Sequence, residues 1–179
     1  TIDRIKWKMG TSELPTAEIT YNGAVGYPVG PMDRGVANIV GIVLTTSRLT
    51  VGISGAASMT RAAREAAKYG EFRTAFGQPI GEFPLLATQI RTMERDARRS
   101  TAGAFKVYGA TFQLEGGLIG GLPKDASLEA RKDSFDVREL IMLQKMCTTR
   151  DCIDVLHNAI SVFAGHGVSG FLVKPFASA

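Results

Sequence analysis

Helical periodicity over three long segments constrains the fold of this chain more than any other feature. Apolar residues recur there every three or four positions, as in amphipathic helices. The three segments are residues 33–70, 84–114 and 134–163. Asp33 and Ser134 are candidate N-caps, and Gly70 is a candidate stop for the first helix. The pattern predicts a mainly α protein, an antiparallel up-and-down helical bundle with room for a fourth helix.

The apolar side of each predicted helix is expected to form the core. In the first helix the expected residues are Val36, Ile39, Val40, Val43 and Leu44. In the second they are Ile90, Met93, Ala97, Ala104, Tyr108 and Phe112. In the third they are Val137, Leu140, Ile141, Leu143, Leu156, Ala159, Ile160 and Phe163. Gly52 and Gly55 carry no side chain, which indicates that another backbone approaches the first helix closely.

Residues 1–30 have a pattern typical of short strands. The alternating segment 16–21 is followed by the turn signal Asn22-Gly23 and by a second strand candidate, residues 24–27. Because an isolated hairpin is marginally stable in water, this piece is expected to pack on helices or to complete a larger sheet. Residues 115–133 read as a long linker that is mobile or covered.

Composition narrows the class of protein. The 179 residues are 45% hydrophobic, and 21 basic against 17 acidic residues give a net charge of +4. These values exclude disorder and a disulfide scaffold, and so small a charge excess makes nucleic acid an improbable partner. The basic cluster Arg91, Arg95, Arg98 and Arg99 is interleaved with Glu94 and Asp96, which favours a solvated helix face with ion pairs. The apolar run 36–44 is shorter than the roughly 20 residues of a membrane span.

Cysteine and histidine usage argues against a metal site. Cys147 and Cys152 lie five positions apart on a predicted helix, without a companion Cys/His cluster, so buried, reduced thiols are expected. Reduced thiols indicate a reducing compartment, the cytoplasm. His157 and His166 have no nucleophile motif beside them, which argues against a hydrolytic triad. His157 is expected to be a packed or surface residue.

Two segments could hold a ligand. Arg73, Thr74 and Phe76 lie at a corner between the first two helices, where an Arg can bind a pyrophosphate and an aromatic ring can stack on a flat ring. The same pattern suits an Arg that caps helix carbonyls and a Phe that fills the core. In the segment 163–167, Gly165 could let a ligand approach the backbone, or the segment could be a helix stop with left-handed residues. The residues alone leave both alternatives open.

Several segments, in this order, resemble the acyl-CoA dehydrogenase flavoprotein family and within it the AidB-like branch. The specific one is Arg73-Thr74-Ala75-Phe76-Gly77-Gln78-Pro79-Ile80. The weaker ones are Lys8–Thr11, Pro15–Ile19, Val29-Gly30, Arg34-Gly35, Arg48, Tyr69 and Phe163–Val168. Together they extend over nearly the whole chain, and the pair Pro84-Leu85 is what resembles the AidB-like branch.

The resemblance implies a domain organisation and a site. Residues 1–30 would be the end of a β-rich middle domain, and residues 31–179 an incomplete C-terminal helical bundle domain. FAD would lie between subunits of a homo-oligomer, a dimer or tetramer. Arg73, Thr74, Phe76 and Gly165 would contact this cofactor, and Arg48 would lie near the acyl-CoA substrate.

The chain also departs from the family pattern. Pro84 stands where many relatives carry a Gln that contacts FAD, and Ser47 stands where some carry the catalytic base. The usual catalytic glutamate has no counterpart in the chain, so the catalytic residue is left unassigned. The resemblance implies α,β-dehydrogenation of an acyl-CoA thioester by the parent protein, with this part alone inactive. The alternatives are a non-catalytic helical oligomerisation or interaction module, and an AidB-like protein of the DNA-damage response.

Overall fold

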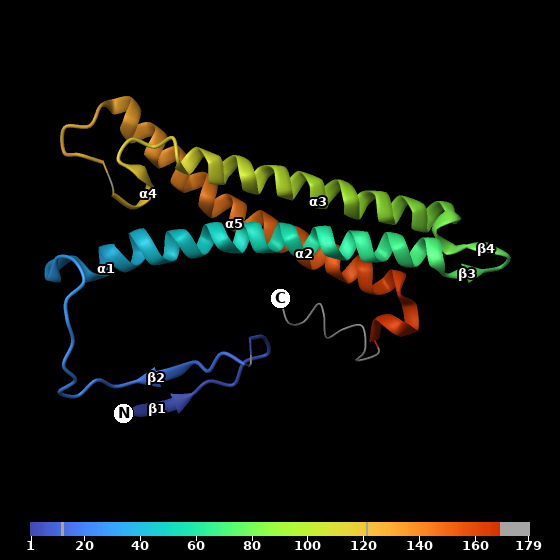
Figure 1. Ribbon diagram of the computed structural model, residues 1–179, viewed down its shortest axis with the longest axis horizontal. Helices are drawn as coiled ribbons and strands as arrows, with labels where there is room; N and C mark the ends of the chain where they lie inside the picture. The colour runs from blue at the N-terminus through green and yellow to red at the C-terminus, as the bar shows by residue number, and fades with distance from the viewer. Residues whose placement is uncertain (12, 121, 169–179) are drawn as a thin grey trace.

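The computed structural model describes residues 1–11, 13–120 and 122–168 (Figure 1). Three long helices lie side by side, each running opposite to the next along the chain. They are α2 (Thr45–Phe72), α3 (Pro84–Thr111) and α5 (Leu128–Val162). This arrangement confirms the predicted mainly α, antiparallel bundle. The predicted end of the helical domain at residue 179 lies outside the described residues.

The first long helix is preceded by three shorter helical elements without a break. These are η1 (Met32–Arg34), α1 (Gly35–Asn38) and the π-helix η2 (Ile39–Leu44). Asp33 lies inside η1, whose N-cap is Pro31, so the predicted cap at Asp33 is wrong. Gly70 does not stop α2 either, because the helix ends at Phe72 and Arg73 is extended. Gly70 instead lets another segment approach: a Cβ there would lie 3.4 Å from the Cα of Gly81.

This continuous run, Met32–Phe72, is the one candidate for a membrane-spanning helix among the described residues. Its 41 residues contain an 18-residue window of mean hydropathy 1.6, of which 11% is buried. By length and composition alone the whole run is long enough to span a bilayer, although its apolar stretch 36–44 is as short as the sequence indicated. Core helices of soluble proteins have the same length and composition, so one such helix does not establish a membrane span.

The core lies where α2, α3 and α5 meet. Its larger cluster includes Met59, Ile90, Met93, Ala97, Val155 and Ala159. Small residues let α2 and α5 approach closely: a Cβ on Gly52 would lie 2.7 Å from Nε2 of Gln144, and one on Gly55 would lie 2.9 Å from Cγ2 of Thr148. The predicted approach of another backbone is confirmed at Gly55, where the Thr148 carbonyl oxygen would lie 3.7 Å from a Cβ, whereas at Gly52 the close neighbour is the Gln144 side chain.

Several predicted core positions are exposed instead. They are Val36, Ile39, Val40, Val43 and Leu44 in the first segment, Tyr108 and Phe112 in the second, and Leu140 and Leu143 in the third. Helical spacing identified an apolar face in each case, but no described residue covers these parts of the helices. The predicted periodicity of these faces is therefore right, and what the prediction lacked is that no described segment packs against them.

The third long helix begins earlier than predicted. Ser127 is the N-cap, and its hydroxyl accepts a hydrogen bond from the backbone N–H of Ala130 at 3.1 Å, so the cap predicted at Ser134 is wrong. The charged segment 128–136 is helical although it lacks a continuous apolar side. The predicted linker is correspondingly shorter and contains the one-turn helix α4 (Gly117–Gly120).

The predicted hairpin has a different partner strand. β2 (Ala17–Ile19) pairs antiparallel with β1 (Ile2–Ile5), with Ile5 opposite Ala17, and residues 24–27 form no strand. Trp7, two residues beyond the end of β1, is 98% exposed, and most other side chains of this segment are exposed as well. The β segment lies apart from the bundle in Figure 1, so its apolar side chains have no covering layer among the described residues.

Candidate functional site

A short hairpin between α2 and α3 presents the most specific sequence motif. β3 (Thr74–Ala75) pairs with β4 (Gln78–Pro79), and the 3-10 helix η3 (Ile80–Glu82) leads into α3. The two turn residues, Phe76 and Gly77, both have positive φ, 52° and 87°. Two such residues define the tight hairpin turn whose twist matches its strands. Gly77 adopts this conformation freely, whereas Phe76 is held in it at a cost.

Arg73 lies where α2 ends and the hairpin begins. Its guanidinium Nη1 donates a hydrogen bond to Oη of Tyr69 at 2.8 Å, one helical turn earlier. The cap on α2 comes from the Arg73 backbone N–H, which donates to the Tyr69 carbonyl at 2.9 Å. The interpretation of the Arg73 side chain as a carbonyl cap is therefore wrong. No carboxylate among the described residues forms an ion pair with Arg73, so its exposed guanidinium keeps a full positive charge and unused donors.

Phe76 is 97% exposed, so it does not fill the core as one interpretation had it. Its ring meets only the edge of Phe83, with centroids 6.3 Å apart. Thr74 is exposed as well, on the same hairpin. An uncompensated guanidinium, a hydroxyl and an uncovered aromatic ring thus lie within four consecutive positions. This set of groups fits a ligand with an anionic diphosphate and a flat ring.

The glycine-rich turn after α5 lies at the same end of the bundle. It forms the 3-10 helix η4 (Ala164–Val168), and the left-handed residue that ends α5 is Ala164, with φ 51°. A Cβ on Gly165 would meet nothing within 4 Å, whereas one on Gly167 would lie 2.3 Å from the Ile160 carbonyl oxygen. Gly167 is therefore required by packing, and Gly165 leaves exposed backbone that a ligand can approach.

Tyr69 joins this turn to Arg73. Its Oη lies 2.9 Å from Nδ1 of His166, and its ring meets Phe163 at a centroid distance of 4.9 Å. Arg73 and the Gly165 turn, which are more than 90 positions apart in the sequence, are thereby brought together. The sequence pattern assigns neither Tyr69 nor His166 a role in this site. Tyr69 is one of the residues that carry the family resemblance, but no local sequence pattern predicts its contact with a residue 97 positions away.

Arg48 lies at the other end of α2, 25 residues before Arg73. At the helical rise per residue this corresponds to about 37 Å, so one chain cannot bring the two arginines to one small ligand. The structure therefore separates the predicted site residues into two groups. Arg73, Thr74, Phe76 and Gly165 share one end of the bundle, and Arg48 stands alone near the other.

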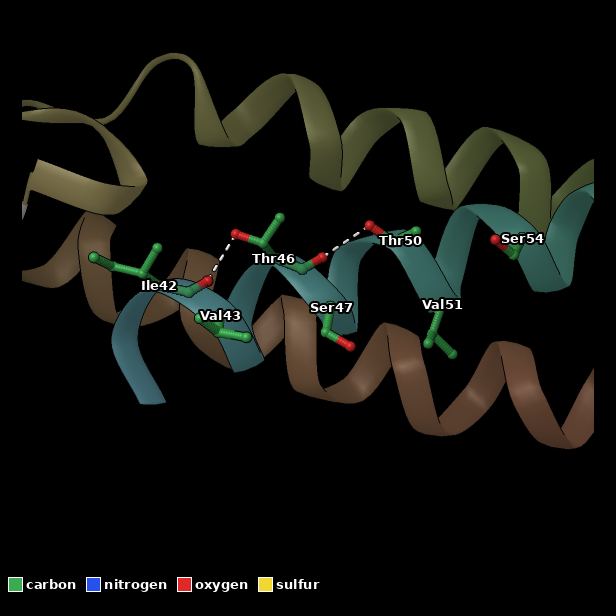
Figure 2. A pocket seen from close by; sticks show the side chains of 7 residues that line it. All are labelled: Ile42, Val43, Thr46, Ser47, Thr50, Val51 and Ser54. Atoms are coloured by element: carbon green, nitrogen blue, oxygen red, sulfur yellow. Dashed lines mark hydrogen bonds between the residues drawn. The ribbon is translucent and has the colours of Figure 1, made fainter. Parts of the chain in front are cut away.

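A shallow pocket of about 540 Å³ lies near Arg48 on the outer face of the helix (Figure 2). It is lined by Ile42, Val43, Thr46, Ser47, Thr50, Val51 and Ser54. The hydroxyls of Thr46 and Thr50 donate to carbonyls of their own helix, at 2.7 Å and 3.0 Å, as the dashed lines in Figure 2 show. Apolar side chains, beside threonine hydroxyls that are already hydrogen-bonded to the helix, suit an acyl chain. No lining residue carries a carboxylate, and Arg48 is not among them.

The remaining candidate residues are surface groups. The basic cluster on α3 is solvated and paired, for example Arg98 with Glu94 at 3.1 Å, as predicted. His157 is exposed, in agreement with its expected surface position. Cys147 is exposed, contrary to the expected burial. Cys152 is partly buried, and desolvation by burial raises the pKa of its thiol.

Comparisons with known proteins agree with this architecture. Residues 33–117 match the sequence model of the family described as acyl-CoA dehydrogenase, C-terminal domain. The chain is 29% identical over 164 residues to acyl-CoA dehydrogenase family member 11 of Caenorhabditis elegans, covering 92% of this chain and 25% of that protein. It is 27% identical over 175 residues to 3-methylmercaptopropionyl-CoA dehydrogenase of Ruegeria pomeroyi, covering 94% of this chain and 28% of that one.

Solved structures show the same fold. "Bd2924 apo-form" superposes with a TM-score of 0.80 at 28% identity, over 98% of this chain and 33% of that one. Caenorhabditis elegans ACDH-11 in complex with C11-CoA gives a TM-score of 0.80 at 26% identity, over 98% and 28%. The fold is that of an acyl-CoA dehydrogenase C-terminal helical domain, and the matches support this family for the chain. The chain spans about a quarter of the curated relatives' length.

Proposed function

We propose that this chain is the C-terminal part of an FAD-dependent acyl-CoA dehydrogenase-like oxidoreductase, which removes hydrogen from the α and β carbons of an acyl-CoA thioester. The observation that carries the proposal is the exposed guanidinium of Arg73, which is uncompensated by any described carboxylate and held in place by Tyr69. Such a group is a ready site for a dinucleotide diphosphate. The AidB-like branch and a cytoplasmic location belong to this proposal, supported by Pro84-Leu85 and by free thiols.

Four residues would hold FAD. Arg73 would donate to the diphosphate, Thr74 would add a hydroxyl, Phe76 would lie against the adenine side, and the backbone at Gly165 would approach the same dinucleotide. When bound, the flavin supplies the hydride acceptor for the β carbon. The residues of this chain bind and orient it. Because the turn at Phe76 points its ring away from the bundle core, we propose that the cofactor lies between this chain and a second subunit.

The pocket beside Arg48 would receive the substrate. Ile42, Val43 and Val51 offer an apolar wall for an acyl chain, and the similar Caenorhabditis elegans structure contains C11-CoA. The seven lining residues include no general base for the α-proton. The contribution of this chain there is therefore orientation and exclusion of water, with Arg48 near the thioester end.

A homo-oligomer, a dimer or tetramer, is part of the same proposal. Several large apolar side chains of α5 are exposed, namely Phe135, Leu140, Met142, Leu143, Met146 and Ile153. They lie along one helix, and burying them against another subunit would remove their apolar surface from water. These residues also favour the second candidate function, a non-catalytic helical module that oligomerises without flavin.

One experiment separates the two functions. The complete protein, expressed from its whole gene, is purified without added cofactor and its visible absorbance is recorded before and after anaerobic addition of a medium-chain acyl-CoA. The proposal expects a flavin spectrum that bleaches with the acyl-CoA and not with free CoA. A stable oligomer that carries no flavin and takes up none from added FAD would contradict it and support the non-catalytic module.

A further inference from the structure

We propose that Tyr69 is a positioning residue for Arg73, and that His166 in turn fixes the hydroxyl of Tyr69. The three side chains come from α2, from the start of the hairpin and from η4, and they form one chain of contacts at the end of the bundle. The inference rests on the proposed function, because it assigns these residues a task toward the diphosphate that Arg73 would bind.

The hydrogen-bonding roles follow from the chemistry of each group. A guanidinium only donates, so the phenol oxygen accepts from Arg73 at 2.8 Å. The single hydroxyl hydrogen of Tyr69 is then free to donate to Nδ1 of His166 at 2.9 Å. In this arrangement Nδ1 of His166 is the acceptor and its Nε2 carries the ring hydrogen. A phenol that donates to an imidazole becomes a better acceptor, so the two hydrogen bonds strengthen each other.

The ring of Tyr69 is itself held. It is partly buried, it packs against the main core cluster, and it meets the buried Phe163 at 4.9 Å between centroids. The phenol oxygen therefore projects from a fixed point toward Arg73. An exposed Arg side chain otherwise loses about 2 kcal/mol of rotamer entropy when a ligand fixes it. Fixing the guanidinium beforehand removes part of that cost from binding.

Tyr69 is an uncharged partner for Arg73, and this matters for anion binding as much as its position does. A carboxylate partner would also fix Arg73, but it would cancel the positive charge and compete with a diphosphate. A phenol leaves the charge uncompensated and four of the five guanidinium N–H groups unused by Tyr69. Tyr69 thus orients Arg73 without weakening its attraction for an anion.

The test is a double-mutant cycle on FAD affinity, measured by flavin fluorescence with the complete protein. Tyr69→Phe removes only the oxygen, and we expect it to weaken binding about fivefold to tenfold, less than the full effect of a charge-assisted hydrogen bond because Arg73 itself still binds the ligand. Arg73→Ala should weaken it about a hundredfold. In the double variant Tyr69→Phe should add nothing, since the residue it positions is gone. Tyr108→Phe, on α3 and outside the site, is the matched control and should leave the affinity unchanged.

His166 is tested by rescue. His166→Ala should weaken FAD binding about threefold, and His166→Asn should restore it, because the Asn carbonyl oxygen can accept where Nδ1 does. If Tyr69→Phe weakens binding equally with and without Arg73, or not at all, the positioning inference is wrong while the proposed function stands. If the wild-type protein binds no FAD, the proposed function is wrong and the inference with it.

Discussion

The two ends of the first long helix differ in whether other segments of the chain pack against them. At the Arg73 end, side chains from α2, α3 and η4 meet: Ile90 packs beside Gly70, and Tyr69 contacts Phe163 and His166. At the other end, the residues of η2 and α1 project apolar side chains into solvent. One end is therefore packed by described residues and presents polar groups, whereas the other presents an apolar surface that a partner would cover. Under the proposed function, this chain would itself orient the cofactor at the packed end, and the apolar end would need a second surface to hold the substrate.

The largest expected effect is on the free energy of unfolding, when an isoleucine at the packed end is replaced and one at the apolar end serves as the comparison. Ile90→Ala removes a buried side chain at the packed end and should lower the free energy of unfolding by about 2–5 kcal/mol. Ile39→Ala makes the same chemical change on the exposed π-helix at the other end and should cost less than about 0.5 kcal/mol. Urea unfolding followed by circular dichroism measures both. Equal losses of unfolding free energy in the two variants would show that Ile39 is also covered in the folded protein, which would contradict the contrast between the two ends.

A smaller effect on the stability of the fold is expected when a glycine at each end is replaced by alanine. A Cβ on Gly81 would lie 3.2 Å from the backbone of Gly70, so Gly81→Ala should push the hairpin away from α2 and cost about 1–3 kcal/mol. Gly41, in η2, has nothing within 4 Å of an added Cβ, and Gly41→Ala should be neutral or stabilise by up to about 1 kcal/mol. Thermal unfolding of both variants gives the comparison. A harmless Gly81→Ala would show that the close approach does not fix the hairpin.

Sequence reasoning predicted the helices well because their periodicity is a local property. It missed what depends on distant partners. Helical spacing assigned Tyr108 and Phe112 to the core, but a spacing does not say whether another segment covers that face. The turn signal Asn22-Gly23 suggested the following residues as a strand, whereas the strand that pairs with β2 precedes it in the chain.

The candidate site shows the same limit. The motif from Arg73 to Ile80 was recognisable because its residues are consecutive, and the hairpin that they form exposes Arg73 and Phe76 together. The contact between Tyr69 and His166 could not be predicted, since it depends on how α5 ends beside α2. The sequence does not identify Ser127 as a cap, because the charged turns that follow it lack an apolar side.

The central claim is that Arg73 binds the cofactor through an uncompensated charge, and one measurement tests it most directly. The FAD dissociation constant of the complete protein is compared between Arg73→Ala and Arg95→Ala, which removes another exposed arginine, one that is paired with Asp96 on α3. The account predicts about a hundredfold weaker binding for Arg73→Ala and no change for Arg95→Ala. Equal affinities in the two variants would contradict the assignment of Arg73 to the flavin site.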